Sequence, residues 1–259
     1  MSGRVILRPA SFARGTRCFR LTVAATRANA LEPCLLRDLH AALDQAEQGS
    51  ADAILICGGP NFSSGGDVGL FLKADREGRG PDYAREVVGL LQSLVLRLVS
   101  MPRLVGVAAR GAITGGSAGL LFASDLAVLS PDAFVQPYYA QVGFAPDGGW
   151  TALLPERIGA GAALDWLLSD RRADAEALVG LGLARKTSAE PEAAAEALLD
   201  HQATDALIAA KRLIWDEARR KAFEARLASE LETFIQRIVA PGVRDGMDRF
   251  LHGRESAHV

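Results

Sequence analysis

Two short runs of apolar residues, separated by one amphipathic segment, constrain this chain more than any other feature. The run AILIC lies within residues 51–59 and stops at Gly-Gly-Pro, and the run LVGVAA lies within residues 103–109. Both are short enough and apolar enough to be buried strands. Between them, residues 81–101 place apolar side chains at helical spacing, and Pro102 bounds that helix. Since parallel neighbouring strands need such a crossover, the pattern predicts an α/β core.

The rest of the chain divides into an N-terminal part that extends this core and a helical C-terminal part. A strand is predicted at 15–24, a helix at 32–48, a further helix at 115–124 and a strand at 125–130. After about residue 147 the pattern becomes helical, with one short extended piece. The helices are expected at 164–183, 190–201, 204–239 and 241–253, and the extended piece at 183–188. We therefore expect a C-terminal helical layer.

Composition excludes several functional classes. The 259 residues are 49% hydrophobic and carry a net charge of −2, which is not the electrostatic pattern of a protein that binds nucleic acid or an anionic membrane. No apolar run is long enough to span a membrane, and the first 15 residues lack the apolar core of a signal peptide. The three cysteines and four histidines are scattered, so we expect free thiols, a cytoplasmic location and no metal site.

Two glycine-rich loops follow the two apolar strands, and each leads toward a helix. They are GGPNFSSGGDV (58–68) and GAITGGSAG (111–119). Glycine lets backbone N–H groups face a ligand, and a helix N-terminus adds free donors. Two such loops on adjacent strands can direct two N–H groups at one oxygen, as in an oxyanion hole. Spacing alone ranks close packing first, anion binding second and an oxyanion hole third, and neither loop matches a nucleotide-binding glycine motif.

At these loops the chain resembles the crotonase superfamily of enoyl-CoA hydratases and isomerases. The resemblance runs from about residue 20 to about residue 252, and the matching segments occur in the family's order. They are TRANAL (26–31), NFSSGGDV (61–68), GAITGGSAGLLFASDLAV (111–128), FVQPYYAQVGFAPDGGWTALLPERIG (134–159) and DALIAAKRLIWDEA (205–218).

This resemblance implies a fold, an assembly and a class of ligand. It implies a β-β-α spiral core over residues 1–195 and a helical trimerisation region over residues 196–259, giving a homotrimer or homohexamer. The implied substrate is an acyl-CoA thioester. No separate cofactor is implied, because CoA is part of the substrate.

The resemblance also assigns an oxyanion hole and identifies what is missing beside it. The N–H groups of Gly66 and Gly116 are implied as donors to the thioester oxygen when an enolate forms. Hydratases of the family use two glutamates, and their positions are occupied here by Gly119 and Tyr138. Because hydration needs both a base for water and a proton donor, the sequence disfavours ordinary hydratase activity. Tyr138 and Tyr139 are expected either to line the acyl pocket or to pack as core residues.

One acid remains near this site, Asp147 in the segment FAPDGGW. Family isomerases often use an acid here, and one buried carboxylate suffices to move a proton from C2 to C4 of a 3-enoyl group. The favoured interpretation is therefore a Δ3–Δ2 enoyl-CoA isomerase with Asp147 as the base. The alternatives are a helix cap at Asp147, a hydratase, a hydrolase or dehalogenase-like enzyme, and an inactive acyl-CoA-binding protein.

Four further residues are candidates for substrate binding by resemblance. By resemblance Arg27 and Lys211 could meet CoA phosphates, Lys211 from a neighbouring subunit, but for each the favoured interpretation is an ordinary solvated charge. Ser64 is expected beside the adenine or as a small loop residue, and Asp67 is expected to shape the first glycine loop. Asp125 is expected to be structural.

Overall fold

A six-stranded sheet and a three-stranded sheet organise the computed structural model, which describes residues 4–256. The strand orders are β1-β2-β3-β4-β6-β9 and β5-β7-β8. In the large sheet only the β1–β2 pair is antiparallel. The strands are β1 (Val5–Ser11), β2 (Arg17–Val23), β3 (Ala53–Cys57), β4 (Leu104–Ala109), β5 (Ala112–Thr114), β6 (Leu126–Leu129), β7 (Phe134–Gln136), β8 (Ala173–Asp174) and β9 (Lys186–Thr187).

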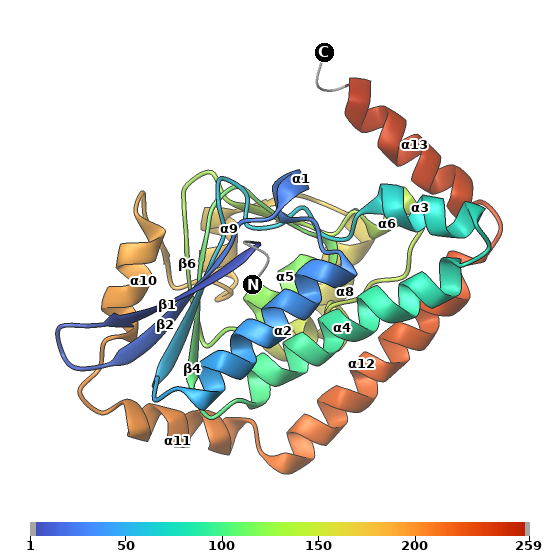
Figure 1. The fold of residues 1–259 in the computed structure, drawn as a ribbon. Coiled ribbons are helices and arrows are strands. Elements are labelled where there is room, and N and C mark those ends of the chain that lie inside the picture. The colour runs from blue at the N-terminus through green and yellow to red at the C-terminus, as the bar shows by residue number, and fades with distance from the viewer. Residues whose placement is uncertain (1–3, 257–259) are drawn as a thin grey trace.

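Helices surround these sheets, and the longest form one packed layer (Figure 1). They are α1 (Thr26–Asn29), α2 (Pro33–Gln48), α3 (Val68–Arg76), α4 (Gly80–Ser100), α5 (Ala118–Phe122), α6 (Tyr139–Val142), α7 (Leu154–Ile158), α8 (Ala160–Ser169), α9 (Ala175–Gly180), α10 (Pro191–Leu199), α11 (Thr204–Ile214), α12 (Glu217–Ile238) and α13 (Val243–Ser256). A 3-10 turn, η1 (Gly115–Ser117), precedes α5. None of the described helices is both long and apolar enough to cross a membrane.

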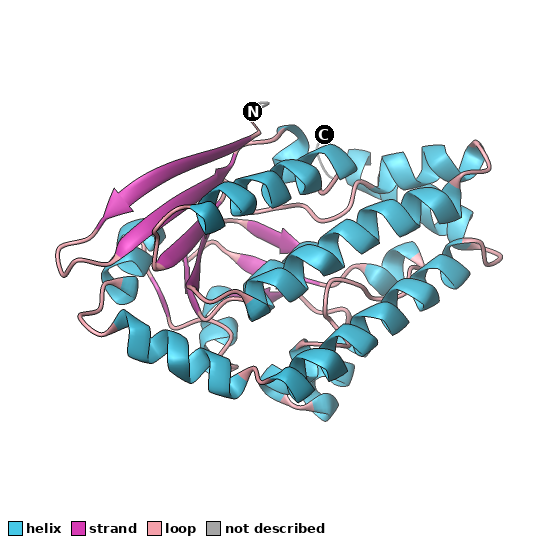
Figure 2. Cartoon of the chain, turned by 60° about the horizontal axis from the view of Figure 1, so that its bottom comes forward, coloured by secondary structure: helices cyan, strands magenta, loops and turns pink. Residues whose placement is uncertain are grey.

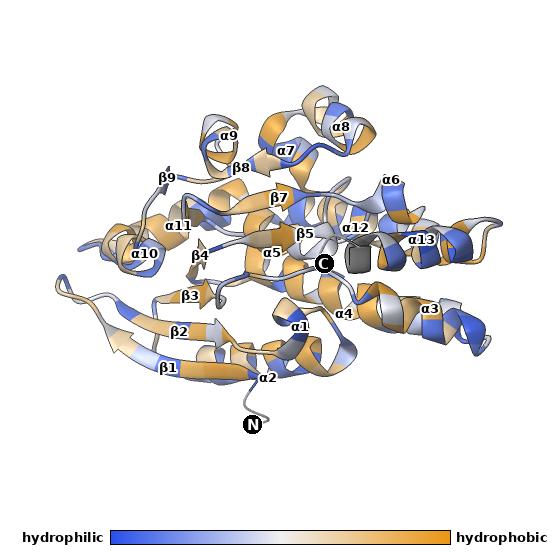
Figure 3. Ribbon diagram, turned by 90° about the horizontal axis from the view of Figure 1, so that it is seen from above, coloured by the Kyte–Doolittle hydropathy of each residue, from blue (hydrophilic) through white to orange (hydrophobic). Residues whose placement is uncertain are grey.

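Strand β3 is buried on both faces, which explains its continuous apolar sequence. Ile54 and Ile56 belong to the main core with residues of α2 and α4, whereas Leu55 and Cys57 belong to a second cluster beneath α10. Because side chains alternate across a strand, a strand covered on both faces needs apolar residues at every position. Figure 3 shows hydrophobic residues along β3, β5 and β7. The α/β core predicted from these runs is confirmed.

The chain winds through the two sheets in a repeated strand–strand–helix order. It passes from β4 in the large sheet to β5 in the small sheet and then to α5, and next from β6 to β7 and then to α6. A parallel bridge between Ser63 and Ile113 brings the loop after β3 alongside β5 in the same way. This is the β-β-α spiral with a helical C-terminal region that the resemblance implied.

The C-terminal helices differ in detail from the prediction. The predicted helix 204–239 is two helices, since α11 ends at Ile214 and the Asp216 carboxylate caps α12 by accepting the N–H of Arg219. The predicted helix 164–183 is also broken, because Ala173 and Asp174 pair with β7. The first break begins at a local cap, and the second satisfies a tertiary contact that helical periodicity does not report.

The boundary expected between residues 195 and 196 falls inside α10. Ala195 and Leu199 of this helix both pack in the cluster beneath the large sheet, so α10 covers the core as one unit. Helix α12 in turn lies along α4 (Figures 1 and 2). The described part of the C-terminal region is therefore continuous with the core, and its role in trimerisation stays a prediction.

A left-handed turn precedes α2 and borders the first glycine loop. Arg27, Ala28 and Asn29 have φ values of 53°, 53° and 56°. For residues with a Cβ this region costs about 1–2 kcal/mol each, so surrounding contacts must hold it. The buried Asn29 side chain accepts the N–H of Ala25 at 2.7 Å and donates to the carbonyls of Asn61 and Phe62 at 3.1 Å.

We expect Asn29→Ala to lower the free energy of unfolding by about 2–4 kcal/mol, because it leaves several buried polar groups without partners. Urea unfolding followed by circular dichroism measures this change. Gln48→Ala, at an exposed position of α2, is the matched control and is expected to change stability by less than about 0.5 kcal/mol. Equal effects of the two substitutions would contradict this role of Asn29.

Candidate active site

The two glycine loops lie side by side at the ends of their strands. Ser63 donates its N–H to the carbonyl of Ala112 at 2.9 Å, and its own carbonyl accepts the N–H of Thr114 at 3.1 Å. Gly65 has a φ of 76°, and a Cβ at this position would lie 2.5 Å from the Thr114 carbonyl oxygen. The backbones of the two loops therefore approach one another closely, as close packing and an oxyanion hole both require.

Two N–H groups remain open in this region. Within the described residues no protein acceptor takes the N–H of Gly66. Gly116 lies in the first turn of η1, where an N–H has no partner inside the helix. Both glycines line one cavity of about 60 Å³, together with Phe71, Phe144 and Phe234. An oxygen placed in this cavity has two candidate donors, one from each loop.

Asp147 lies in the same cavity and is almost completely buried, with 7% of its surface exposed. The hydroxyl of Tyr139 donates to its Oδ1 at 2.5 Å. Its carboxylate lies directly beside Gly116, since a Cβ on Gly116 would be 2.6 Å from Oδ1. The other carboxylate oxygen, Oδ2, accepts no hydrogen bond from any described residue. This oxygen is therefore free to take a proton.

Burial raises the pKa of Asp147 to about 7, the hydrogen bond from Tyr139 opposes this rise, and the negative charge of Glu230 adds to it. A carboxyl with a pKa near neutrality exchanges a proton readily at physiological pH, which suits a general base.

The alternative of a simple helix cap at Asp147 has a direct structural test. The N–H groups of Gly149, Thr151 and Ala152, which follow Asp147, are taken by the carboxylate of Glu230 at 2.7–2.9 Å. The capping function at this turn therefore belongs to Glu230 on α12. The Asp147 side chain instead faces Tyr139 and the cavity.

Position 119 is closed by backbone. A Cβ on Gly119 would lie 1.9 Å from the carbonyl oxygen of Gly148, far inside any allowed contact. A Cβ on Gly148, where φ is 63°, would in turn lie 2.4 Å from the carbonyl oxygen of Gly116. The turn that carries Asp147 therefore occupies the space that a side chain at position 119 would need.

The two tyrosines have different surroundings. Tyr138 has a φ of 62°, donates its N–H to the carboxylate of Asp170, and packs its ring edge-on against Phe250 of α13 at 5.5 Å. It lines the cavity wall. Tyr139 is buried against Trp150 and contacts Asp147 directly. The residue that touches the candidate base is thus Tyr139, and no sequence motif distinguished it from its neighbour.

Three of the predicted substrate-binding residues lie at the cavity entrance or next to it. Arg27 pairs with Asp67, and Asp67 also caps α3 by accepting the N–H of Leu70 at 3.1 Å. The Ser64 hydroxyl donates to the carbonyl of Arg27 at 3.0 Å, and Ser64 lines the cavity. Arg27 keeps 63% of its side chain exposed, so its guanidinium is accessible to an anionic ligand.

The structure corrects the prediction that Lys211 binds substrate in this chain's own pocket. Its ammonium group, 5% exposed, donates to the carbonyls of Leu98 and Arg103 at 3.0 Å and to Asp125 at 2.7 Å. These partners precede β4 and β6, on the edge of the sheet where α11 lies, at the bottom of Figure 1. The glycine loops follow the opposite ends of the strands. Lys211 thus holds Asp125, which also accepts the N–H of Val105 and is structural as expected.

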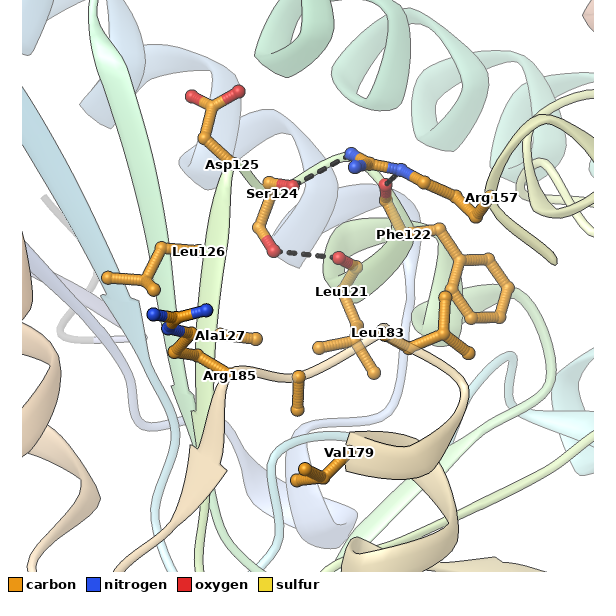
Figure 4. Close-up of a pocket in the computed structure, with 12 residues that line it drawn as sticks. Leu121, Phe122, Ser124, Asp125, Leu126, Ala127, Arg157, Val179, Leu183 and Arg185 are labelled. Carbon is orange, nitrogen blue, oxygen red and sulfur yellow. Dashed lines mark hydrogen bonds between the residues drawn. The ribbon is translucent and has the colours of Figure 1, made fainter. Parts of the chain in front are cut away.

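A larger cavity, of about 280 Å³, lies between the end of α5, the start of β6 and the segment after α9 (Figure 4). Arg157 reaches across it and donates to the carbonyls of Phe122 and Ser124 at 3.0 and 2.8 Å. The cavity contains neither glycine loop and no candidate base. The smaller cavity beside Asp147 contains both glycine loops and the candidate base. It is therefore the candidate active site, although larger cavities exist.

Comparisons with known proteins agree with this fold. The sequence model of the family described as enoyl-CoA hydratase/isomerase matches residues 21–258. Cyclohexa-1,5-dienecarbonyl-CoA hydratase of Thauera aromatica is 32% identical over 179 residues, which are 68% of this chain and 66% of that protein.

Solved structures share the fold at lower identity. An enoyl-CoA hydratase from Bacillus halodurans superposes with a TM-score of 0.83 at 19% identity, covering 94% of this chain and 99% of that chain. An enoyl-CoA hydratase/isomerase from Xanthobacter autotrophicus Py2 gives a TM-score of 0.81 at 23% identity and covers 99% of both chains. The fold is that of the crotonase superfamily. The chain belongs to the enoyl-CoA hydratase/isomerase family.

The raised pKa of Asp147 predicts a pH-dependent stability. Because the folded state keeps a proton that the unfolded chain releases, this stabilisation is present below about pH 4 and is lost as the pH rises through about 7. Asp147→Asn carries no charge at any pH and accepts the same Tyr139 hydrogen bond. We expect its melting temperature to exceed that of the unsubstituted protein by about 5 °C or more at pH 8, with little difference at pH 4.

Differential scanning fluorimetry across pH 4–8 measures this difference. Asp165→Asn, an exposed position on α8, is the control and is expected to follow the unsubstituted protein at every pH. If the melting temperature of Asp147→Asn also matched that of the unsubstituted protein at every pH, the Asp147 carboxyl would be as well solvated in the folded protein as in the unfolded chain.

The contact between Gly119 and Gly148 predicts that Gly119→Ala lowers the free energy of unfolding by about 3 kcal/mol, since the added methyl group must displace the turn that carries Asp147. Gly180→Ala, where nothing lies within 4 Å of the new Cβ, is the matched control and is expected to be neutral or slightly stabilising. Urea unfolding compares the two variants. A tolerated alanine at position 119 would refute the close approach of the two segments.

Proposed function

We propose that this protein is an enoyl-CoA isomerase that shifts a double bond from the Δ3 to the Δ2 position of an acyl-CoA thioester. The observation that carries the proposal is the single buried carboxylate of Asp147, with a pKa of about 7 and one open oxygen, beside the backbone of Gly116. An isomerase needs one group that takes a proton and returns it at another carbon.

The proposed reaction uses two sets of groups. The N–H groups of Gly66 and Gly116 donate to the thioester oxygen, which gains negative charge as the substrate loses a proton. Asp147 Oδ2 takes the proton from C2, the electron pair of that C–H bond forms a dienolate, and the resulting carboxylic acid returns the proton at C4. The product is the conjugated 2-enoyl thioester, and Asp147 is again ionised. Tyr139, bonded to Oδ1, keeps the other oxygen directed at the substrate.

A hydratase is the second candidate, and the relatives named as hydratases favour it. In that reaction Asp147 would activate water, and a tyrosine of the cavity would be the other polar group. The lack of space at Gly119 supports the isomerase over the hydratase. Family hydratases use two carboxylates, and one of them would have to lie at position 119.

The experiment is to mix the protein with trans-3-hexenoyl-CoA and follow the absorbance of the conjugated thioester. We expect turnover without any added cofactor. We expect Asp147→Asn to lower kcat by about 10²-fold or more, as for a lost general base, while Asp165→Asn keeps normal activity. Addition of water to crotonyl-CoA, measured in parallel, identifies a hydratase.

Three results would replace the proposal. Hydration of crotonyl-CoA without isomerisation favours the second candidate. Release of free CoA from either thioester indicates a hydrolase. Tight binding of acyl-CoA without turnover of any thioester indicates a binding protein that has lost catalysis.

A further inference from the structure

Glu230 is a buried acid that the proposed reaction does not use. It lies on α12, in the C-terminal helical layer, and only 4% of its surface is exposed. It does not line the candidate active site. A carboxylate buried to this extent is costly unless several donors satisfy it, so its partners indicate what it does.

Its two oxygens accept four hydrogen bonds from one short turn. Oε2 accepts the N–H of Gly149 at 2.9 Å, and Oε1 accepts the N–H of Thr151 at 2.7 Å, the Thr151 hydroxyl at 2.8 Å and the N–H of Ala152 at 2.9 Å. These donors begin a helical turn, in which Leu153 and Leu154 donate to the Gly149 carbonyl. Glu230 is therefore a cap supplied from a distant helix.

The same turn carries the candidate base. Asp147 and Gly148 immediately precede the residues that Glu230 holds, and the Asp147 carbonyl accepts the N–H of Trp150. Gly148 lies against Gly116 and Gly119, so a displacement of the turn moves Asp147 relative to both the oxyanion donor and the pocket. Removing the cap leaves three backbone N–H groups without an acceptor, in the segment that fixes the position of Asp147.

The groups that face Asp147 come from few elements. Tyr139 of α6 donates to it, Glu230 of α12 is the nearby like charge, and η1 and α4 contribute the Gly116 backbone and the apolar Leu91. Across residues 4–256, neither carboxylate forms an ion pair. The charge of Glu230 is thus not neutralised by a cation, and it adds to the effect of burial in raising the pKa of Asp147.

We propose that Glu230 is a positioning residue that holds the 147–152 turn against the oxyanion loop. The proposal rests on Asp147 being the base. It predicts that the C-terminal helical layer tunes the active site through one side chain, without touching the substrate.

The test compares Glu230→Gln with Glu232→Gln. The second is the same substitution on the same helix, at an exposed residue paired with Arg85. Glutamine at 230 can keep acceptors for Thr151 and Ala152 but removes the charge and leaves one N–H without a carboxylate oxygen. We expect kcat for 3-hexenoyl-CoA to fall about tenfold with KM within about twofold, because the base is displaced and the binding groups are not.

The second readout is the titration of Asp147, which does not depend on activity. Carbon-13 NMR of protein labelled at aspartate carboxyls, assigned with Asp147→Asn, measures its pKa directly. We expect Glu230→Gln to lower this pKa, because a like charge is removed, and Tyr139→Phe to raise it, because a stabilising hydrogen bond is removed. Glu232→Gln is expected to leave both the titration and kcat unchanged.

The outcomes separate the two proposals. A normal Asp147 titration and a normal kcat in Glu230→Gln would overturn the positioning role and leave Glu230 as a cap alone. A shifted titration together with full activity in Asp147→Asn would overturn the proposed base. If Glu230→Gln does not fold by near-ultraviolet circular dichroism, Thr151→Val, which removes only the hydroxyl donor, carries the test. We then expect a smaller fall in kcat, and an unchanged kcat would refute the positioning role.

Discussion

The backbone of Gly148 approaches the start of the η1–α5 segment more closely than any side chain would allow. Its carbonyl oxygen would lie 1.9 Å from a Cβ on Gly119, and the Gly116 carbonyl would lie 2.4 Å from a Cβ on Gly148. Because these positions are glycine, two segments from different parts of the spiral stack backbone to backbone. The Asp147 carboxylate thereby lies beside the candidate oxyanion donor, and no space is left for a side chain at position 119.

Two buried carboxylates near this contact have opposite surroundings. Glu230 receives four hydrogen bonds and faces backbone, whereas Asp147 receives one from Tyr139 and keeps an oxygen open to the cavity. Burial raises the pKa of both acids, but four hydrogen bonds oppose that rise at Glu230, whereas one side-chain hydrogen bond, from Tyr139, opposes it at Asp147. The difference in hydrogen bonding separates a structural role from a chemical one.

Sequence patterns were most reliable where burial is strong and local. The runs around β3 and β4 were predictable because both faces of these strands are covered, which leaves only apolar residues. The strands β5, β7 and β8 are two or three residues long, too short for a period to be read, and β1 was not predicted either. The break before Ala173 likewise follows from a contact with another segment, the pairing of β8 with β7.

The sequence by itself determined the α/β core, the family and the two glycine loops, because each of these is a local pattern of residue types. The tertiary structure decided the rest. In the folded chain Tyr139 donates a hydrogen bond to Asp147, and the cap is Glu230, whose partner Gly149 is 81 residues away in the chain. Lys211 lies at the opposite ends of the strands from the glycine loops. Contacts between segments so far apart leave no periodicity or motif in the chain, and they exist only once the spiral has folded.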